Sequence, residues 1–304
     1  MKTKAWVKAA RLRTLPLALS CIAMGGFMAA VYHSFSWAVM VLSLITTVFL
    51  QVLSNLANDY GDSVSGVDGL ERQGPDRAVQ SGLITLGEMK RAIVWMAILS
   101  FVTGVALIYL AFPNNWITAL VLLLVGVAAI YAAITYTAGK SPYGYMGLGD
   151  ISVFIFFGLV GVMGSFFLHT GFLMYEIALP AASCGLFAVA VLNVNNIRDI
   201  ESDKLAGKKS IPVRIGRSKA VVYHWLLLGL GFLSAVIYVL INFEGIVQFG
   251  FVLALPLLFN NALAVYRKRK AMELDPYLRQ MAVTTMLFVV FFGISHLIQQ
   301  ALNG

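Results

Sequence analysis

The sequence predicts an all-α integral membrane protein, a single domain over residues 1–304 in which nine transmembrane helices form a bundle. Hydrophobic residues make up 60% of the chain and charged residues only 12%, with a mean hydropathy of +0.83. These values exceed what the core and surface of a soluble protein of this size require. The apolar residues also gather in segments of roughly 20, the length of helix that crosses about 30 Å of hydrocarbon.

The apolar segments are separated by short polar stretches. They are centred near residues 14–33, 37–57, 92–112, 116–138, 149–169, 174–194, 220–241, 246–265 and 281–301. Five basic residues precede the first segment, as in a signal peptide. Because no small-residue cleavage site precedes Tyr32 and His33, we expect an uncleaved first helix.

The basic residues predict the orientation, because Lys and Arg near helix ends stay on the cytoplasmic side. With the N-terminus in the cytoplasm, all 22 Lys and Arg fall in inside segments, which are 1–13, 58–91, 139–148, 195–219 and 266–280. The C-terminus is then outside. The net charge of +8 therefore reflects topology and anionic lipid, and we expect the lipid bilayer and no nucleic acid among the partners.

Two polar clusters end apolar segments. The first lies in LSNLANDYGD at 53–62, where Asn58 and Asp62 share one helical face, Asn55 extends that stripe, and Asp59 also approaches Asp62.

The second cluster lies in VLNVNNIRDIESD, with Asn195, Asp199 and Asp203 spaced i, i+4, i+8. Asn58 aligns with Asn195, and Asp62 with Asp199, at one offset of 137 residues.

This offset equals four predicted helices. It predicts a parallel repeat of helices one to four, about 14–138, and five to eight, about 149–265, with a ninth helix at about 281–301. Four crossings is an even number, so both clusters reach the cytoplasmic face. Facing carboxylates repel one another and require a cation, and oxygen ligands of this kind suit Mg²⁺. The alternative is that these residues are solvated helix caps, which are common at helix ends.

Basic residues near the clusters indicate a diphosphate ligand. Arg198 lies between two acids, Lys208 and Lys209 follow the second cluster, and Lys140 ends the fourth apolar segment. Mg²⁺-binding carboxylates surrounded by Lys and Arg suit a diphosphate better than a cation pathway, although the positive-inside bias also explains the two neighbouring lysines. Four tyrosines are candidates for facing a cationic intermediate, or are interfacial aromatics, and these are Tyr60, Tyr136, Tyr143 and Tyr145.

The NxxxD element from Asn58, the NxxxDxxxD element from Asn195 and the spacing of Tyr136 and Lys140 resemble the UbiA-type membrane prenyltransferases. Four longer strings resemble, more narrowly, the branch of that family that prenylates 1,4-dihydroxy-2-naphthoate in menaquinone synthesis. They are RLRTLPLA, LSNLANDYGD, ITYTAGKSPYGYMGLGD and VLNVNNIRDIESDKLAGKKSIPVRIG. The resemblance extends from Arg11 to about Arg217, and it departs from the family pattern at one place. Gly66 stands where the first element would have its third acid, so Asp59 or Asp68 supplies that ligand, and we favour Asp59.

The resemblance implies an enzyme of the bacterial cytoplasmic (inner) membrane, with its site at the cytoplasmic face. Mg²⁺ held by the two clusters would bind the diphosphate of a polyprenyl donor, and the aromatic acid acceptor would attack the allylic cation and lose its carboxylate. The expected metal-binding residues are Asn58, Asp59, Asp62, Asn195, Asp199 and Asp203. The expected catalytic residues are Lys140, Arg198, Lys208 and Tyr136. The expected substrate-binding residues are Arg13, Arg72 and Arg77 for the acceptor carboxylate, with Tyr60, Tyr143 and Asn55.

Two alternatives stay open. Another member of the same superfamily would use 4-hydroxybenzoate, homogentisate, haem or a sugar phosphate as acceptor. A secondary transporter or Mg²⁺ channel is the other class, but transporters commonly have inverted repeats with ion sites near the midplane. The repeat predicted here is parallel, and its acids lie at one membrane face, which favours the enzyme.

Overall fold

The computed structural model describes residues 2–65, 79, 82–139 and 141–304, and every regular element in that part of the chain is helical. Nine helical segments within it are long and apolar enough to cross a membrane, which confirms the predicted fold class. In chain order the elements are α1 (Lys2–Ala10), η1 (Leu12–Thr14), α2 (Leu15–Val31), α3 (Trp37–Val64), α4 (Leu86–Ala111), α5 (Trp116–Thr135), η2 (Tyr143–Met146), α6 (Gly149–Val153), η3 (Phe154–Met163), α7 (Gly164–Thr170), η4 (Tyr175–Ile177), α8 (Ala178–Arg198), α9 (Ile200–Leu205), α10 (Ile211–Ile241), η5 (Ile246–Ala254), α11 (Leu255–Arg267) and α12 (Ala271–Asn303).

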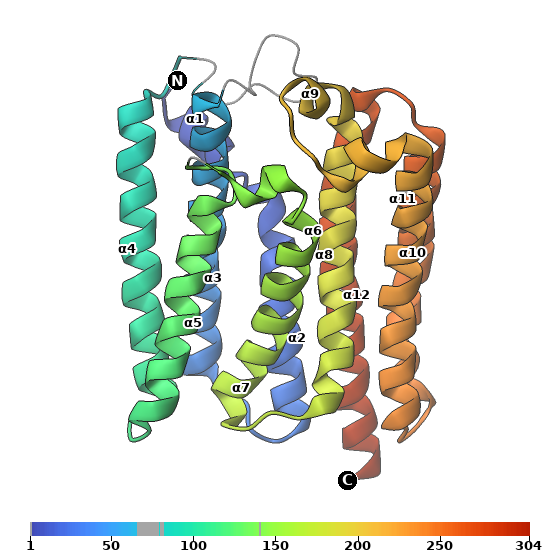
Figure 1. Cartoon of the computed structure of the whole chain (residues 1–304). Coiled ribbons are helices and arrows are strands. Elements are labelled where there is room, and N and C mark those ends of the chain that lie inside the picture. The colour runs from blue at the N-terminus through green and yellow to red at the C-terminus, as the bar shows by residue number, and fades with distance from the viewer. Residues whose placement is uncertain (1, 66–78, 80–81, 140) are drawn as a thin grey trace.

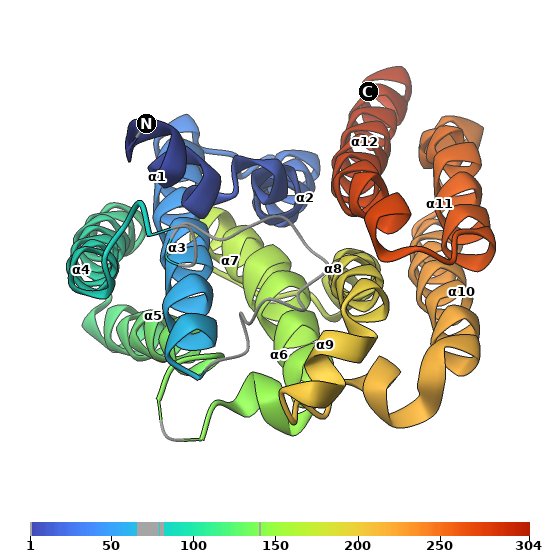
Figure 2. The same ribbon diagram turned by 90° about the horizontal axis from the view of Figure 1, so that it is seen from above.

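The long helices run side by side as a bundle (Figure 1). Seen from above, α4 and α5 lie at one side of the bundle and α10 and α11 at the opposite side, with α8 and the α6–α7 segment between them (Figure 2). The helix α12 begins at Ala271, about three turns before the predicted apolar segment, because its polar first turns are helical too. The element α10 begins at Ile211, but its backbone is kinked at Gly216, which has a left-handed φ of 77°.

Local sequence signals set several helix starts. Ser36 caps α3 and Asn115 caps α5, each by accepting a hydrogen bond from the backbone N–H three residues on. Thr85 and Glu88 form a capping box at the start of α4. These caps satisfy N–H groups that would otherwise have no partner at the helix ends.

The main core lies between α2, α8, α10 and α12. Phe187, Phe251, Phe288 and Phe292 are fully buried there and their rings contact one another at centroid distances of 5.0–6.1 Å. In contrast, no residue in the most apolar part of α5 is buried. An apolar helix that stays exposed within the protein is expected where it faces lipid.

The fifth crossing contains an irregular segment. Its middle part, η3, is a π-helix of ten residues between the short helices α6 and α7. The wider turns of a π-helix shift the side chains that follow relative to those of an α-helix, and such segments occur mostly at functional sites. Phe157 of this segment faces the cavities described below.

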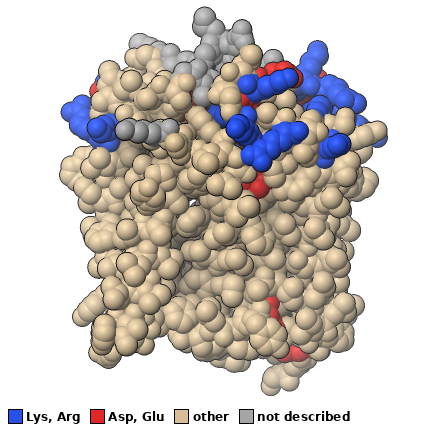
Figure 3. All heavy atoms as spheres, viewed as in Figure 1, with Lys and Arg blue, Asp and Glu red and all other residues tan. Residues whose placement is uncertain are grey.

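The charged residues are gathered unevenly on the surface. The side chains of Lys and Arg visible in Figure 3 lie at one end of the bundle, the end at which α9 and the N-terminus lie. Both polar clusters reach this end, because α3 and α8 run in the same direction and each ends in its cluster.

Candidate active site

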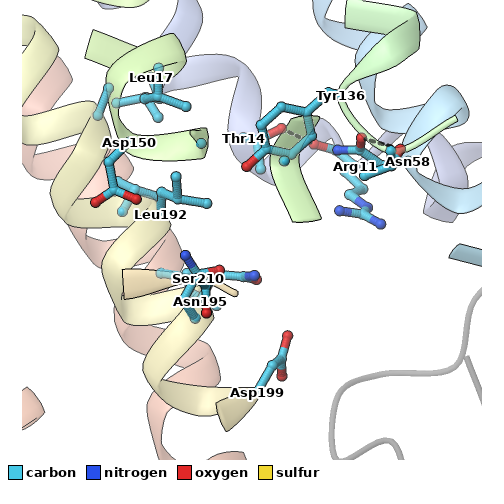
Figure 4. Close-up of a pocket in the computed structure, with 18 of the residues that line it drawn as sticks. Arg11, Thr14, Leu17, Asn58, Tyr136, Asp150, Leu192, Asn195, Asp199 and Ser210 are labelled. Atoms are coloured by element: carbon cyan, nitrogen blue, oxygen red, sulfur yellow. Dashed lines mark hydrogen bonds between the residues drawn. The ribbon is translucent and has the colours of Figure 1, made fainter. Parts of the chain in front are cut away.

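A polar cavity of about 210 Å³ lies between the end of α3 and the end of α8. The first cluster contributes Asn58 and Asp62 to its lining, and the second contributes Asn195, Asp199 and Asp203. Figure 4 shows that Asn58 and Asn195 approach the cavity from different helices. The two clusters predicted to face each other are therefore brought together in one site.

Lys208 bridges the two clusters. Its Nζ lies 3.3 Å from Oδ1 of Asp62 and 3.4 Å from Oδ1 of Asp203. The ammonium also lies 4.7 Å from the ring centroid of Tyr145, whose hydroxyl donates a hydrogen bond to Asp62. One cation thus holds together a carboxylate from each half of the chain.

The environment of Asp203 shows why a cation is needed there. The pKa of Asp203 is raised to about 6, chiefly by burial and to a lesser extent by the Asp199 and Asp62 carboxylates, while Lys208 lowers it. Removing water disfavours the charged carboxylate, and a neighbouring negative charge adds to that effect. The site therefore favours binding of positive charge between the clusters.

The Asp199 carboxylate is held by a buried guanidinium. Arg198 donates two hydrogen bonds to Asp199, both of 2.7 Å, and one of 2.9 Å to Asn195 Oδ1. Its third nitrogen donates to Asp275 of α12 at 2.7 Å, and Arg13 donates to the other oxygen of Asp275 at 2.8 Å. This network joins α8, α12 and the N-terminal segment, and it fixes the rotamer of Asp199.

Asn58 is fixed from the other side of the cavity. The hydroxyl of Thr137 donates to Asn58 Oδ1 at 2.9 Å and to the carbonyl oxygen of Ala57 at 3.1 Å. This contact requires a close approach of the chain after α5 to α3. A Cβ on Gly61 would overlap the carbonyl group of Thr137, so the approach depends on glycine at that position.

A second, largely apolar cavity of about 400 Å³ extends from the first toward the interior of the bundle. The two cavities share six lining residues, which are Gln51, Asn58, Tyr136, Val153, Phe157 and Leu192. The rest of its lining comes mainly from small and aliphatic side chains of α3, α5 and the η3 segment. A polar chamber with acids and bases thus opens into an apolar chamber, which fits a ligand with a charged head and a hydrocarbon tail.

The profile of the UbiA prenyltransferase family matches residues 18–297. The chain belongs to the UbiA prenyltransferase family. It is 46% identical over 300 residues to a 1,4-dihydroxy-2-naphthoate octaprenyltransferase of Haemophilus influenzae, with 98% of this chain and 97% of that protein covered. A protein of the same name from Escherichia coli is 43% identical over 293 residues, with 95% of each chain covered.

Solved structures share the fold of this UbiA family member. A UbiA homolog from Aeropyrum pernix K1 superposes with a TM-score of 0.70 at 16% identity, covering 95% of this chain and 99% of that one. A UbiA homolog from Archaeoglobus fulgidus bound to DMAPP and Mg²⁺ has a TM-score of 0.59 at 17% identity, covering 94% and 98%. Both likenesses extend over almost the whole bundle.

The donor set of this UbiA site suits Mg²⁺. In the part of the chain that the structure describes, no three His, Cys or acidic side chains converge on one point. Oxygen atoms of Asp62 and Asp203 instead surround the Lys208 ammonium, which stands where a metal cation would bring the same two acids together. Mg²⁺ usually takes only one or two carboxylates and completes its shell with water and phosphate oxygen, so this set fits the ion.

Two predicted site residues contact the N-terminal segment. Asp59, favoured above as a third acidic ligand, forms an ion pair with Arg11 and is not among the residues that line either cavity. Asn55 donates hydrogen bonds to the carbonyl oxygen of Ala10 at 2.9 Å and to Thr14 at 3.3 Å, so it anchors the N-terminal segment while lining the apolar cavity. Asp59 and Asp62 lie one turn apart on neighbouring parts of one helical face, but Arg11 pairs with Asp59, whereas Asp62 lines the polar cavity.

The predicted tyrosines divide in the same way. Tyr136 lines both cavities, and Tyr143 lines the apolar one and contacts Tyr136 edge-on at 5.3 Å between ring centroids. Burial raises the pKa of both phenols. Tyr60 instead packs against the small core cluster between α1, α3 and α4.

The remaining predictions divide between described and undescribed parts of the chain. Arg13 lines the polar cavity, whereas Arg72, Arg77, Lys140 and the alternative ligand Asp68 lie outside the residues that the structure describes.

The sequence interpretation assigned no role to four residues that line or support the site. They are Arg11, Asp150, Asp275 and Arg279. Asp150 and Arg11 stand within the strings that carry the family resemblance, so a signal was present for them. The sequence carried no such signal for Asp275 and Arg279. They belong to the first turns of α12, about 75 residues beyond the second cluster, and only the packing of the bundle brings them to the cavity.

Proposed function

We propose that this UbiA family member transfers a polyprenyl group from polyprenyl diphosphate to 1,4-dihydroxy-2-naphthoate, with loss of the acceptor's carboxylate, in menaquinone synthesis. The observation that carries the proposal is the junction of the two cavities, where two acidic clusters and several cations meet an apolar chamber. The relatives named 1,4-dihydroxy-2-naphthoate octaprenyltransferase, at 43–46% identity over nearly the whole chain, support this acceptor.

The polar chamber would hold the diphosphate of the donor. Asp62, Asp203 and Asp199 would hold Mg²⁺, which would bind the diphosphate and offset the charge that grows on it as the allylic C–O bond breaks. Lys208 would exchange its carboxylate partners for a phosphate oxygen, since its side chain already reaches between both clusters. Preorganised cations at the leaving group are the main way in which such a site lowers the barrier.

Arg198 has a different role in this proposal from the one its position in the sequence predicted. Its guanidinium already donates to Asp199, Asn195 and Asp275, and its side chain is 2% exposed. A guanidinium so occupied does not donate to the leaving group. It holds Asp199 in place for the metal, as outer residues commonly do around metal ligands.

The apolar chamber would hold the first isoprene units of the donor. A volume of about 400 Å³ is within the range of pockets for drug-sized ligands, and too small for a long polyprenyl chain. Val125 of α5 lines this chamber and is 39% exposed on a lipid-facing helix. The remainder of the chain would therefore leave the bundle beside α5, into the hydrocarbon of the membrane.

The acceptor would enter from the polar end and place its ring at the junction. Arg13 is the described candidate for its carboxylate, because it lines the polar cavity and its side chain is 36% exposed. We place this end of the bundle in the cytoplasm of a bacterium, with the C-terminus on the other side, because the visible Lys and Arg gather there.

The test is a product assay with purified protein. A polyprenyl diphosphate and Mg²⁺ are offered together with each of a panel of aromatic acids, and the release of carbon dioxide and the mass of the product are measured. We expect a prenylated, decarboxylated product from 1,4-dihydroxy-2-naphthoate. Product from 4-hydroxybenzoate with none from dihydroxynaphthoate would contradict the proposed acceptor.

A further inference from the structure

Asp150 is a buried carboxylate that has no role in the proposed diphosphate site. It begins the fifth crossing, is 7% exposed and lines the polar cavity. In Figure 4 it lies away from Asp199, and a Cβ on the preceding Gly149 would lie 3.4 Å from Leu192. Because Leu192 also lines the apolar chamber, Asp150 lies at the junction of the two cavities, where the reacting carbons of donor and acceptor would meet.

The partners of Asp150 are neutral. Tyr223 of α10 donates a hydrogen bond to its Oδ2 at 2.9 Å, and no Lys or Arg in the described ranges forms an ion pair with it. A buried carboxylate within a membrane-spanning segment is costly unless it is paired. For this reason an acid at such a position is a functional candidate, in contrast to a surface acid.

Tyr136 lies next to this carboxylate. A Cβ on Gly149 would lie 2.6 Å from the Tyr136 hydroxyl oxygen, so glycine at 149 lets that hydroxyl approach the backbone beside Asp150. Burial, followed by the charge of Asp150, raises the pKa of Tyr136. The phenol therefore stays neutral and serves as a hydrogen-bond donor, which leaves Asp150 as the acceptor of protons at this junction.

The other carboxylates of the cavity are engaged by cations. Asp199 accepts two hydrogen bonds from Arg198, and Asp62 and Asp203 both lie near the Lys208 ammonium. A carboxylate stabilised by a positive charge is a weak base. Among the acids lining the cavity in the described part of the chain, Asp150 is the one that forms no ion pair with a Lys or Arg.

We propose that Asp150 is a catalytic residue of the acceptor half of the site, which takes the proton of the acceptor hydroxyl next to the carbon that is prenylated. The proposal rests on the function proposed above. A general base raises the reactivity of the ring, because a phenolate pushes electron density into the ring carbons more strongly than a neutral phenol, and such a base typically contributes a factor of about 10²–10⁴ in rate.

The steps balance without an oxidant or an external proton. The ring carbon that bears the carboxylate bonds to the allylic carbon, the allylic C–O bond breaks, and diphosphate leaves with its electron pair. The hydroxyl proton moves to Asp150 and the hydroxyl becomes a ketone. The bond from the ring to the carboxylate then breaks, carbon dioxide leaves, the electron pair passes to the ketone oxygen, and Asp150 returns the proton there.

The test compares the Asp150→Asn variant with the wild-type protein, each as the full chain in detergent or in lipid bilayers. We expect kcat with 1,4-dihydroxy-2-naphthoate to fall about 10²–10⁴-fold, while Mg²⁺-dependent binding of a non-hydrolysable prenyl thiolodiphosphate stays within about twofold. Fluorinated acceptors with more acidic hydroxyls should narrow the gap between variant and wild type, since an acceptor that ionises readily needs a base less. Tyr223→Phe, which keeps the carboxylate and removes its hydrogen bond, is the matched control and should lose far less.

Three results would overturn the assignment. The first is an Asp150→Asn variant with near-normal kcat, and the second is a variant that loses donor binding together with activity. The third is a loss of kcat that is equally large for all acceptors, whatever the acidity of their hydroxyl groups. Should Asp150→Asn fail to fold, Asp150→Ala with added formate decides the matter, since recovery of activity supports the proposal and no recovery contradicts it. A wild-type protein that makes no product from any hydroxy-aromatic acid contradicts the proposed function instead, whatever the variants do.

Discussion

At the scale of residues, the site depends on how each carboxylate is paired. Asp62 and Asp203 lie near one ammonium, Asp199 is held by a guanidinium, and Asp150 has a phenol as its partner. These aspartates have the same side chain but different surroundings, and we assign them different roles. A nearby cation stabilises the charged form of a carboxylate, whereas burial without a cation disfavours it. The spacing of acids along the chain predicted which of them cluster, while their pairing depended on side chains from distant helices.

Asp275 is expected to tune the metal site without touching it. Asp275→Asn removes a charged partner from the buried Arg198, which holds Asp199. We expect the Mg²⁺ concentration for half-maximal activity to rise roughly 10- to 100-fold, the effect typical of losing an outer partner of a ligand. Glu201→Gln, an exposed carboxylate at the same end of the bundle, is the control. An unchanged Mg²⁺ dependence of Asp275→Asn would show that Asp199 needs no such support.

At the scale of elements, the sequence predicted the helices better than their ends and irregularities. The nine apolar segments match the nine spans found in the described part of the chain, because hydrocarbon thickness requires a minimum length. The π-helical turns of η3 were not predicted, because their residues are as apolar as those of a regular span and the wider winding depends on packing. The apolar pattern also failed to predict the start of α12. The polar first turns of this helix contain Asp275, and they precede the apolar segment.

Gly126 of α5 provides a test of the apolar chamber. It lines that chamber, and a Cβ there would meet no atom within 4 Å, so a larger side chain fits only by filling the chamber. We expect Gly126→Phe to lower kcat/KM for long polyprenyl donors much more than for a two-isoprene donor. Gly229→Phe is the matched control, since Gly229 also faces open space but lines neither cavity. Equal effects on all donor lengths would contradict the assignment of the chamber to the tail.

At the scale of the whole molecule, the arrangement of charge sets the orientation that we propose. The visible basic side chains lie at the end of the bundle that contains the polar cavity, and the bias for Lys and Arg would keep that end in the cytoplasm. Both substrates in the proposed reaction are anionic at their reactive ends. The same basic surface that directs insertion therefore attracts the diphosphate and the aromatic acid toward the cavity.

Cysteine labelling tests this orientation. In a background with Cys21 and Cys184 replaced by Ala, single cysteines are introduced by Asn114→Cys and Lys270→Cys, at exposed positions near opposite ends of the bundle. A membrane-impermeant maleimide should label the first variant in intact cells and the second only after the membrane is opened. The opposite pattern would place the polar cavity outside the cytoplasm.

In the proposed site, one metal ion is held jointly by the cluster at the end of α3 and the cluster that begins at Asn195 of α8. The most direct measurement is the binding of Mn²⁺, followed by its electron paramagnetic resonance signal, in the presence of a non-hydrolysable prenyl diphosphate. We expect Asp62→Asn and Asp199→Asn each to abolish this binding, and prenyl transfer with it, while both variants still insert into the membrane. Mn²⁺ binding that persists unchanged in either variant would contradict the claim that the two clusters form one site.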